Sequence, residues 1–466
     1  MKVRIQVVIE SEAGETVDAH EIAGIHRKEL RPETLGLTLE EAKTVLEGVQ
    51  RTIVEQQTAE YLQMQSRCPH CGTKRSHKGD HTVTLRTLFG KLRVKSPRVY
   101  HCQCQPRPTR TFSPLAELLP ERSTPELLYL ETKWASLMSY GLTTKLLEEV
   151  LPLGKYVNAE TVRNHLHAVA ERAETELGDE QVFYIDGCPR DWATLPRPDG
   201  PLTVGLDGGY VHSCDKTSRK DGWFEVIAGK SITAEGTAKC FAFVPRYDTK
   251  PKRRVFEVLK SQGMQMNQQV TFLSDGGDTV RQLQLYLNPQ AEHLLDWFHV
   301  AMRVTVMTQM AKGLEGKDVA IQPAVLKELE RSKWYLWHGN VYEACISIDN
   351  LELMLDNDDP LTVKRRSLLK ALRDFRIYIT TNARLIPNYG ERWRYGEAIA
   401  TGFVESTVNQ VISKRCVKSQ QMKWSPRGAH LLLQMRTRVL NDELKDTFRR
   451  WYPGTQNEEV KFKEAA

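Results

Sequence analysis

Residues 205–209 read GLDGG and residues 272–277 read FLSDGG, so an apolar segment twice delivers one aspartate followed at once by two glycines. The surrounding sequence predicts strands, rich in β-branched and aromatic residues, at 201–211, 223–232, 238–247, 268–277 and 291–300, the last of which runs into a helix. Helices are predicted at 252–263 and 279–288. Three successive strands followed by alternating helices and strands indicate a mixed α/β sheet with helices packed on it.

Asp207 and Asp275 would lie side by side if the strand order is 3-2-1-4-5, because the first and fourth strands are then neighbours. Two carboxylates a few Å apart resist joint ionisation, and a divalent cation removes that conflict. Oxygen-only ligands suit Mg²⁺ or Mn²⁺. The adjacent glycines would let a metal and a bulky anionic substrate approach the backbone. For either aspartate alone the alternative is a turn residue, since Asp-Gly is common in turns.

A third acid is expected on a later helix that starts near GFVESTVN, residues 402–409. Glu405 and Asn409 are four residues apart and would share a face of this helix. Lys414 and Arg415 continue the helix with positive charge that suits the DNA backbone. A glutamate on a helix is by itself usually solvated, so the assignment depends on its place after the two aspartates. Asp186 remains a rival for the first carboxylate.

Two close pairs of cysteines predict a zinc site. They are Cys68 and Cys71, in a Cys-x-x-Cys knuckle, and Cys102 and Cys104. Four thiolates form a tetrahedral and therefore structural site, and the sequence between the pairs suggests the hairpin of a zinc ribbon. His101 or His77 could replace one thiol, because the second pair is Cys-x-Cys. The alternative is four unrelated buried cysteines.

A helical segment follows the cysteine module. Residues 123–175 predict three helices, the first ending near Gly141 and the third beginning near residue 158. Arg163, Asn164 and His167 would lie on the exposed face of the third helix, where Arg and Asn can contact base edges in a major groove. A plain helical linker bundle explains the same pattern.

Composition limits the remaining possibilities. The net charge is +6 from 65 Lys and Arg against 59 Asp and Glu, which permits a polyanionic partner without requiring one. No run of about 18 apolar residues predicts a membrane span, and the N-terminus lacks the features of a signal peptide. We therefore expect a cytoplasmic protein without a membrane partner.

The three acids in this order resemble the RNase H-like catalytic domain of DDE transposases. Families with an all-helical insertion before the glutamate have the long interval seen here between Asp275 and Glu405, and Asp296-x-x-His299 matches their signature. Together with the thiolate module, the phrases GLDGGYV, FLSDGG, DWFHV and GFVESTVNQ are most similar to ISKra-type insertion-sequence transposases of bacteria.

This resemblance implies a bacterial, nucleoid-associated enzyme that binds the terminal repeats of its element, hydrolyses phosphodiesters and transfers the freed strand to target DNA, as at least a dimer. Asp207, Asp275 and Glu405 would hold Mg²⁺ or Mn²⁺, and two such ions about 4 Å apart catalyse this kind of displacement. Asp296 and His299 would be auxiliary, or a structural hydrogen-bonded pair.

Trp424 would stack on an unpaired base or, alternatively, pack in the core. The alternatives for the whole chain are a catalytically inactive, transposase-derived DNA-binding protein, or a metal-dependent nuclease or resolvase without strand transfer.

The expected organisation has seven parts. An N-terminal strand and helix (1–66) would precede a zinc-ribbon-like module (67–115) and a helix-turn-helix-like segment (123–178). The catalytic core would begin with residues 182–300, continue after an all-helical insertion (301–395) with the helices that carry Glu405 (396–450), and end in a polar tail (451–466).

Overall fold

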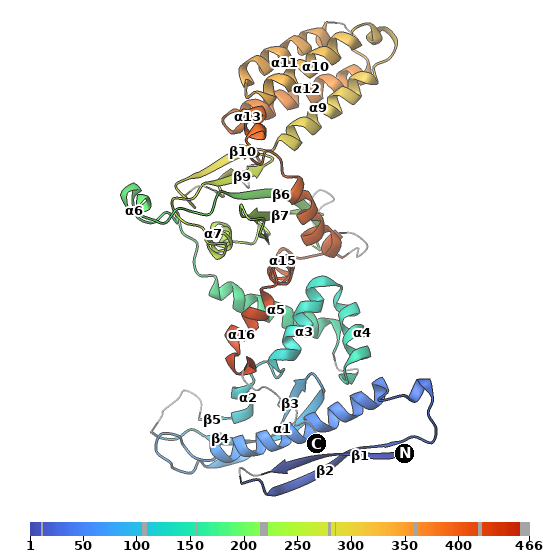
Figure 1. Ribbon diagram of the computed structural model, residues 1–466, viewed down its shortest axis with the longest axis vertical. Helices are drawn as coiled ribbons and strands as arrows, with labels where there is room; N and C mark the ends of the chain where they lie inside the picture. The colour runs from blue at the N-terminus through green and yellow to red at the C-terminus, as the bar shows by residue number, and fades with distance from the viewer. Residues whose placement is uncertain are drawn as a thin grey trace. The chain divides into compact units, whose positions relative to one another are not determined.

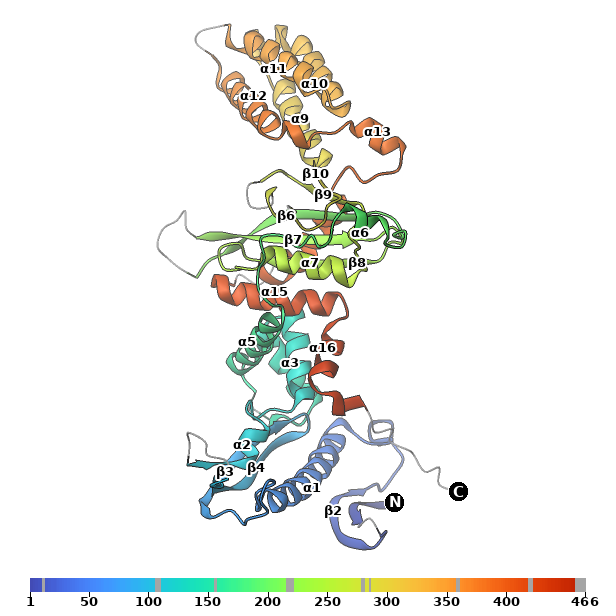
Figure 2. The same ribbon diagram turned by 90° about the vertical axis from the view of Figure 1, so that its left-hand side faces the viewer.

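The computed structural model describes residues 1–456 apart from 11, 12, 105–109, 155, 156, 215–221, 278–280, 285, 358–360 and 418–421. The chain forms two compact units, Met1–Ala170 with Asp442–Ala466, and Glu171–Asn441 (Figures 1 and 2). The predicted part 396–450 is therefore divided, because its last helix belongs to the first unit. Most of the predicted polar tail, from residue 457, lies outside the described residues. No helix in the described part is long and apolar enough to cross a membrane.

The first unit begins with an antiparallel hairpin of β1 (Lys2–Glu10) and β2 (Thr16–His26), of which only the first strand was predicted. Helix α1 (Leu39–Gln65) follows, and its N-terminus is closed by a capping box between Thr38 and Glu41. The short 3₁₀ turn η1 (Pro32–Thr34) precedes it.

The cysteine module contains the predicted hairpin. Strands β3 (His77–Thr87) and β4 (Gly90–Tyr100) pair antiparallel, and β5 (Thr111–Phe112) extends the sheet. The short helix α2 (Pro114–Leu118) contributes Leu115 to a core that the hairpin forms with Val83, Leu85, Leu92 and Val94. The alternation of apolar and polar residues along the strands thus puts one face of the hairpin inside.

The helical segment consists of α3 (Pro125–Leu137), α4 (Tyr140–Val150) and α5 (Ala159–Glu176). The expected helix end at Gly141 is wrong, because α3 ends at Leu137 and Ser139 caps α4 by accepting a hydrogen bond from the Leu142 N–H. In the same unit, α16 (Leu444–Trp451) packs on α3 and is followed by the 3₁₀ turn η6 (Pro453–Gln456).

The second unit contains a five-stranded sheet in the order β10-β9-β6-β7-β8. Numbered within this sheet, the order is 5-4-1-2-3, which confirms the predicted arrangement. Strands β6, β7 and β8 pair antiparallel, whereas β9 and β10 run parallel to β6. Their bounds are Leu202–His212, Trp223–Ile232, Ala238–Phe243, Val270–Ser274 and Ala291–Leu295 for β6 to β10. The short helix α6 (Pro189–Ala193) precedes the sheet.

Helices cover both faces of this sheet. Val204 and Leu206 of β6 pack in one core with Val255 and Leu259 of α7 (Pro251–Ser261). The opposite face of β6 meets α14 (Gly402–Val408), which continues into the π-helix η5 (Asn409–Val417). Helix α15 (Pro426–Leu440) packs against β8.

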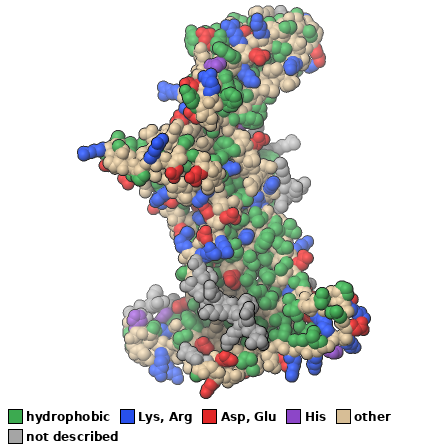
Figure 3. Space-filling model, in the orientation of Figure 1, with side chains coloured by type: hydrophobic (Ala, Val, Ile, Leu, Met, Phe, Trp, Pro, Cys, Tyr) green, Lys and Arg blue, Asp and Glu red, His purple; other side chains and the backbone are tan. Residues whose placement is uncertain are grey.

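The predicted all-helical insertion is present between β10 and α14. It comprises α9 (Trp297–Lys312), α10 (Gln322–Trp337), α11 (Val341–Asp356), α12 (Val363–Thr381) and α13 (Tyr389–Arg394), with 3₁₀ turns η3 (Gly316–Ala320) and η4 (Ala383–Leu385). Helices α9 to α12 form a bundle with its own apolar core. Blue and red side chains are interspersed over this bundle in Figure 3, and Arg373 and Arg376 of α12 pair with acids of α11.

Candidate functional site

Asp207 and Asp275 come level on neighbouring parallel strands. The register pairs Leu202 with Val270 and ends with Gly205 opposite Leu273. Continued by two residues, it sets Asp207 opposite Asp275, which directly follows β9. Adjacent strands lie about 4.8 Å apart. The predicted neighbourhood of the two aspartates follows from this pairing.

The surroundings of Asp207 oppose its ionisation. Burial raises the pKa of its carboxyl above the usual value, and the nearby charges of Asp275 and Asp296 raise it further. A hydrogen bond of 2.7 Å from the Gly208 N–H and the proximity of His299 act in the other direction without offsetting the burial. Asp207 is thus a half-buried carboxyl group close to two other acids, a setting in which a bound cation would favour its ionised form.

Two glycines of β6 let the helix that carries Glu405 pack closely on the face that contains Asp207. A Cβ atom on Gly205 would lie 2.1 Å from Val404 Cγ2, and one on Gly209 would lie 3.1 Å from Ile412 Cδ1. The expectation that the glycines after Asp207 leave room for substrate and metal is therefore wrong at Gly209, because helix side chains fill the space there as they do at Gly205. Glu405 itself is exposed.

Asp296 is fully buried, and its carboxylate is enclosed by hydrogen bonds. It caps α9 by accepting from the Phe298 N–H at 2.8 Å, and it bonds His299 Nδ1 at 2.8 Å. It also accepts from the backbone N–H and the hydroxyl of Thr401, the residue before α14. The hydrogen-bonded pair anticipated as the structural alternative is present, and it also fixes the start of the helix that carries Glu405.

His299 is the partly exposed member of that pair. The hydrogen bond that the His299 ring donates to the Asp296 carboxylate raises the pKa of the imidazole, and the charges of Asp207 and Asp275 add to the effect although burial opposes it. The ring therefore lies within the electrostatic field of both aspartates.

The insertion contacts the end of β9 through residues that the sequence did not single out. Tyr378 of α12 donates a hydrogen bond of 3.0 Å to the backbone carbonyl of Asp275, and Arg303 of α9 lies 4.1 Å from the centre of the Tyr378 ring. Asn382 approaches so closely that a Cβ on Gly276 would lie 2.4 Å from its Oδ1. No local pattern identifies such contacts, because they join residues about a hundred positions apart.

Arg415, which was expected to contact the DNA backbone, is buried instead, and Trp424, for which base stacking and core packing were the alternatives, is buried too. Arg415 is fully buried and lies 5.2 Å over the ring of Trp424, and its guanidinium contacts Met422 Sδ. Trp424 is 5% exposed and pairs with β6 through a bridge to Ser213. A ring with no open face cannot stack on a base, so the core interpretation holds for Trp424. Lys414 is exposed, as expected.

The carboxylates of Asp207, Asp275 and Glu405 do not all lie within 4.8 Å of one another, although all three residues are described. The structure brings together the two aspartates and places the helix of Glu405 on their face. It does not gather the three acids around a single point. Asp186 lies in a turn before α6 and not on the sheet, where its carbonyl accepts from the Trp192 indole.

The four predicted cysteines form a separate cluster in the first unit that can hold a zinc ion. Sulfur separations are 3.5 Å for Cys68 and Cys104, 3.3 Å for Cys71 and Cys102, and 3.6 Å for Cys71 and Cys104. Tetrahedral Zn–S bonds of about 2.3 Å place sulfurs about 3.8 Å apart, close to these values.

The electrostatics of the cluster favour a cation. Backbone N–H groups of Cys71 and His70 lower the pKa of Cys68, and the hydroxyl and backbone of Thr73 lower that of Cys71. The pKa of Cys104 is raised because it faces its neighbouring thiols. Bound metal removes this mutual repulsion. Neither histidine alternative belongs to the cluster, in which the four cysteines alone come together; His77 bonds Asp80, and the ring of His101 stacks on Phe112.

The candidate DNA-reading helix presents part of the predicted surface. Arg163 and Asn164 of α5 are exposed, whereas His167 is half-buried. Arg163 forms a 3.2 Å ion pair with Glu160 of the same helix. His165 turns inward and bonds the buried Glu131 of α3, which joins the two helices.

A buried polar network lies at the α15 side of the sheet. Arg254 of α7 hydrogen-bonds Glu174, Asp248 and Gln434, and His430 lies 3.4 Å from Glu174. Burial raises the pKa of Glu174, but hydrogen bonds from His430 and Arg254 outweigh it and lower the pKa to about 2. Glu174, Asp248 and His430 lie close enough to share an ion, yet Arg254 already supplies their positive charge.

In comparisons with known proteins, no family model and no curated protein matches the chain.

Proposed function

We propose that this chain is a DDE-type DNA transposase with an RNase H-like core. It would bind the ends of its insertion sequence, hydrolyse phosphodiester bonds there and join the freed 3′-hydroxyl to target DNA. The proposal is carried by the parallel register of β6 and β9, which when continued by two residues sets Asp207 opposite Asp275, and by the packing of the Glu405 helix on the same face.

The donor set suits Mg²⁺ or Mn²⁺. Carboxylate oxygens are the ligands these ions prefer, and a cation between Asp207 and Asp275 would relieve the repulsion that helps to raise the pKa of Asp207. Such an ion supplies activation of the attacking oxygen and stabilisation of the leaving oxygen.

The position of Glu405 favours two ions over one. Ligand oxygens on one Mg²⁺ at about 2.1 Å are at most roughly 4 Å apart, whereas the carboxylates of the three acids do not all lie within 4.8 Å of one another. Two ions about 4 Å apart need only one shared carboxylate, which leaves Glu405 to contact one ion. Asp207 would be the shared ligand, because it lies between Gly205 and Gly209 on the strand that α14 covers.

The surrounding residues have positioning roles in this proposal. Asp296 holds the first turns of α9 and α14 together through the backbone N–H groups of Phe298 and Thr401, so it fixes the start of the helix that carries Glu405. The raised pKa of His299 favours its charged form near the two aspartates, where it would attract a DNA phosphate. Tyr378 fixes the backbone of Asp275.

The first unit would recognise the DNA. The exposed Arg163 and Asn164 can reach base edges, and the zinc-stabilised hairpin would contact phosphates with its lysines and arginines. Joining two ends of an element requires at least two active sites, so we expect a homodimer or larger assembly.

The test is cleavage of duplex DNA carrying the terminal repeats that flank the gene, in Mg²⁺, with Asp207→Asn compared with Asp186→Asn. Asp207→Asn should abolish cleavage, whereas Asp186→Asn, an exposed turn residue ahead of the sheet, should retain it. Undiminished cleavage by Asp207→Asn would remove this residue from the mechanism.

The products separate the remaining alternatives. Cleaved ends without joined products would indicate a nuclease or resolvase. Specific binding without cleavage in either Mg²⁺ or Mn²⁺ would indicate a transposase-derived DNA-binding protein.

A further inference from the structure

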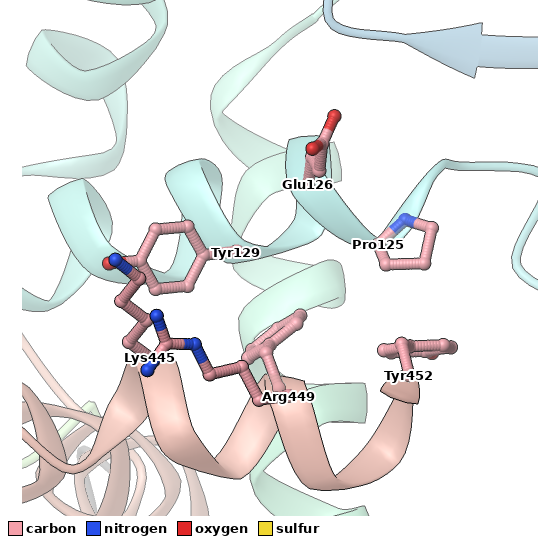
Figure 4. Close-up of a pocket in the computed structure, with 7 residues that line it drawn as sticks. Pro125, Glu126, Tyr129, Lys445, Arg449 and Tyr452 are labelled. Carbon is pink, nitrogen blue, oxygen red and sulfur yellow. The ribbon is translucent and has the colours of Figure 1, made fainter. Parts of the chain in front are cut away.

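A hollow of about 550 Å³ lies between α3 and α16 in the first unit, and its lining includes none of the four cysteines (Figure 4). Its size falls within the range of roughly 300–1,000 Å³ typical of small-molecule sites. It is lined by Pro125, Glu126, Tyr129, Lys445, Phe448, Arg449 and Tyr452.

Aromatic rings form one part of this hollow. Phe448 is buried and meets the ring of Tyr129 edge-on at 5.5 Å, and the ring of Tyr452 lies 6.2 Å from Phe448. Tyr129 and Tyr452 are half-buried, so each keeps part of its ring at the surface of the hollow. Such rings offer flat apolar surface on which a planar heterocycle can stack.

Cations form the other part. Lys445 and Arg449 are exposed and four residues apart, so they lie on one face of α16. Figure 4 shows both side chains extending to the side of Tyr129, whereas the carboxylate of Glu126 points away from them. Lys133 lies 5.7 Å from the centre of the Tyr129 ring and adds a third positive charge.

Arg449 remains able to bind an anion. It forms an ion pair of 3.2 Å with Asp446, but both side chains are largely exposed, at 45% and 73%. Exposed pairs of this kind contribute little free energy. A guanidinium has five N–H donors, so a phosphate can bind without displacing Asp446.

We infer that this hollow is a nucleotide site, in which a base stacks on Tyr129 or Tyr452 and its phosphate is paired by Lys445 and Arg449. Rings and cations within one small hollow match a planar base joined to an anion, whereas a purely apolar ligand would leave the cations unused. The ligand is either a free mononucleotide or an unpaired nucleotide of a DNA strand. The site uses none of the three acids, so it stands or falls separately from the proposed catalysis.

The test uses the full-length protein and calorimetric titration with dAMP, deoxyadenosine and inorganic phosphate. We expect one dAMP per chain and weaker binding of deoxyadenosine and of phosphate, since each lacks one half of the ligand. The double variant Lys445→Gln with Arg449→Gln should weaken dAMP binding by about tenfold or more. Either Tyr129→Leu or Tyr452→Leu should do the same, because a base–aromatic stack contributes on that order.

A matched control removes the same charge elsewhere. Lys327→Gln with Arg394→Gln alters two exposed residues of the insertion and should leave dAMP binding unchanged. Circular dichroism and thermal unfolding show whether each variant is folded. Absence of dAMP binding by the wild-type protein at millimolar concentration, or equal binding by the Lys445/Arg449 variant and the control, would overturn the inference.

Labelled oligonucleotides identify the source of the nucleotide. A strand with an unpaired end that binds more tightly than its blunt duplex, and depends on Lys445 and Arg449, indicates an unpaired nucleotide of DNA. Binding of dAMP that such a strand does not compete with indicates a free nucleotide. Either result supports the site. Loss of cleavage without loss of dAMP binding would reflect only on the proposed catalysis.

Discussion

Gly205→Ala tests the packing of the Glu405 helix on the sheet. The added Cβ would lie 2.1 Å from Val404 Cγ2 and 2.9 Å from Phe403 Cζ, whereas carbon atoms in contact are about 3.5–4.0 Å apart. Both neighbours belong to α14, so the helix must move outward by roughly 1–2 Å. Overpacking of this kind costs about 1–3 kcal/mol. For a unit of this size we expect the unfolding midpoint to fall by about 2–12 °C.

The matched control is Gly402→Ala, in the first turn of the same helix. A Cβ there would meet nothing within 4 Å, so stability should stay unchanged or rise slightly. Thermal unfolding followed by circular dichroism compares the two variants. If the unfolding midpoints of Gly205→Ala and Gly402→Ala differ by less than about 2 °C, the smallest difference expected, α14 does not pack on β6 as described.

The same variant also connects packing to activity. A displacement of about 1 Å in a catalytic group can cost on the order of a hundredfold in rate. Gly205→Ala should therefore reduce Mg²⁺-dependent cleavage by about that factor, while Gly402→Ala cleaves normally. A destabilised Gly205→Ala protein with full cleavage would show that α14 does not carry a catalytic acid.

Three further results are expected. Elemental analysis should find about one zinc ion per chain of wild-type protein and none in Cys71→Ser. Wild-type protein that contains no zinc and whose four thiols titrate freely would contradict the zinc site. The pKa of Glu174 is about 2 in the folded chain, below its usual 4.5, so its ionised form contributes roughly 3 kcal/mol to the free energy of unfolding above pH 4.5. This contribution is lost as the pH falls towards 2. Glu174→Gln should therefore make stability less dependent on pH in this range, and an unchanged dependence would refute the lowered pKa of Glu174. Thr401→Val removes a hydroxyl donor to the buried Asp296 and should lower the free energy of unfolding, measured with denaturant, by about 1–3 kcal/mol. An unchanged free energy of unfolding would show that this hydrogen bond does not stabilise the fold.

The strand pattern was predictable because it is local. Apolar runs and glycines located all five strands of the sheet, and the order of strands and helices was enough to infer that β6 and β9 are neighbours. The second N-terminal strand was missed, since TVDAHEIAGIH has several polar residues and is largely exposed as β2.

The burial of Arg415 follows from a local pattern. Val404, Val408 and Val411 recur at spacings of four and three, which predicts the packing side of this helix, and the next step of four is Arg415. Its burial follows from that spacing, although its positive charge suggested DNA. Trp424 is different, because its bridge to Ser213 joins residues far apart in the chain.

The contacts that organise the candidate site were beyond reach from the sequence. Thr401 and Tyr378 are ordinary residues in their local context, and their importance comes from Asp296 and Asp275, to which the fold brings them. The close approach of α14 and the helix that continues it also shows that Gly205 and Gly209 of β6 allow helix packing and do not open space for a ligand. An aspartate followed by glycines suggests an open site, but only the position of the neighbouring helix shows that the space is filled.

The most direct test of the central claim is the position of Mn²⁺ in a crystal of the protein bound to the DNA of its element end, located by anomalous scattering. The account predicts manganese within about 2.1 Å of carboxylate oxygens of both Asp207 and Asp275, with Glu405 contacting the same ion or a second one about 4 Å away. Manganese absent from these aspartates, while DNA occupies the sheet face beside them, would contradict it.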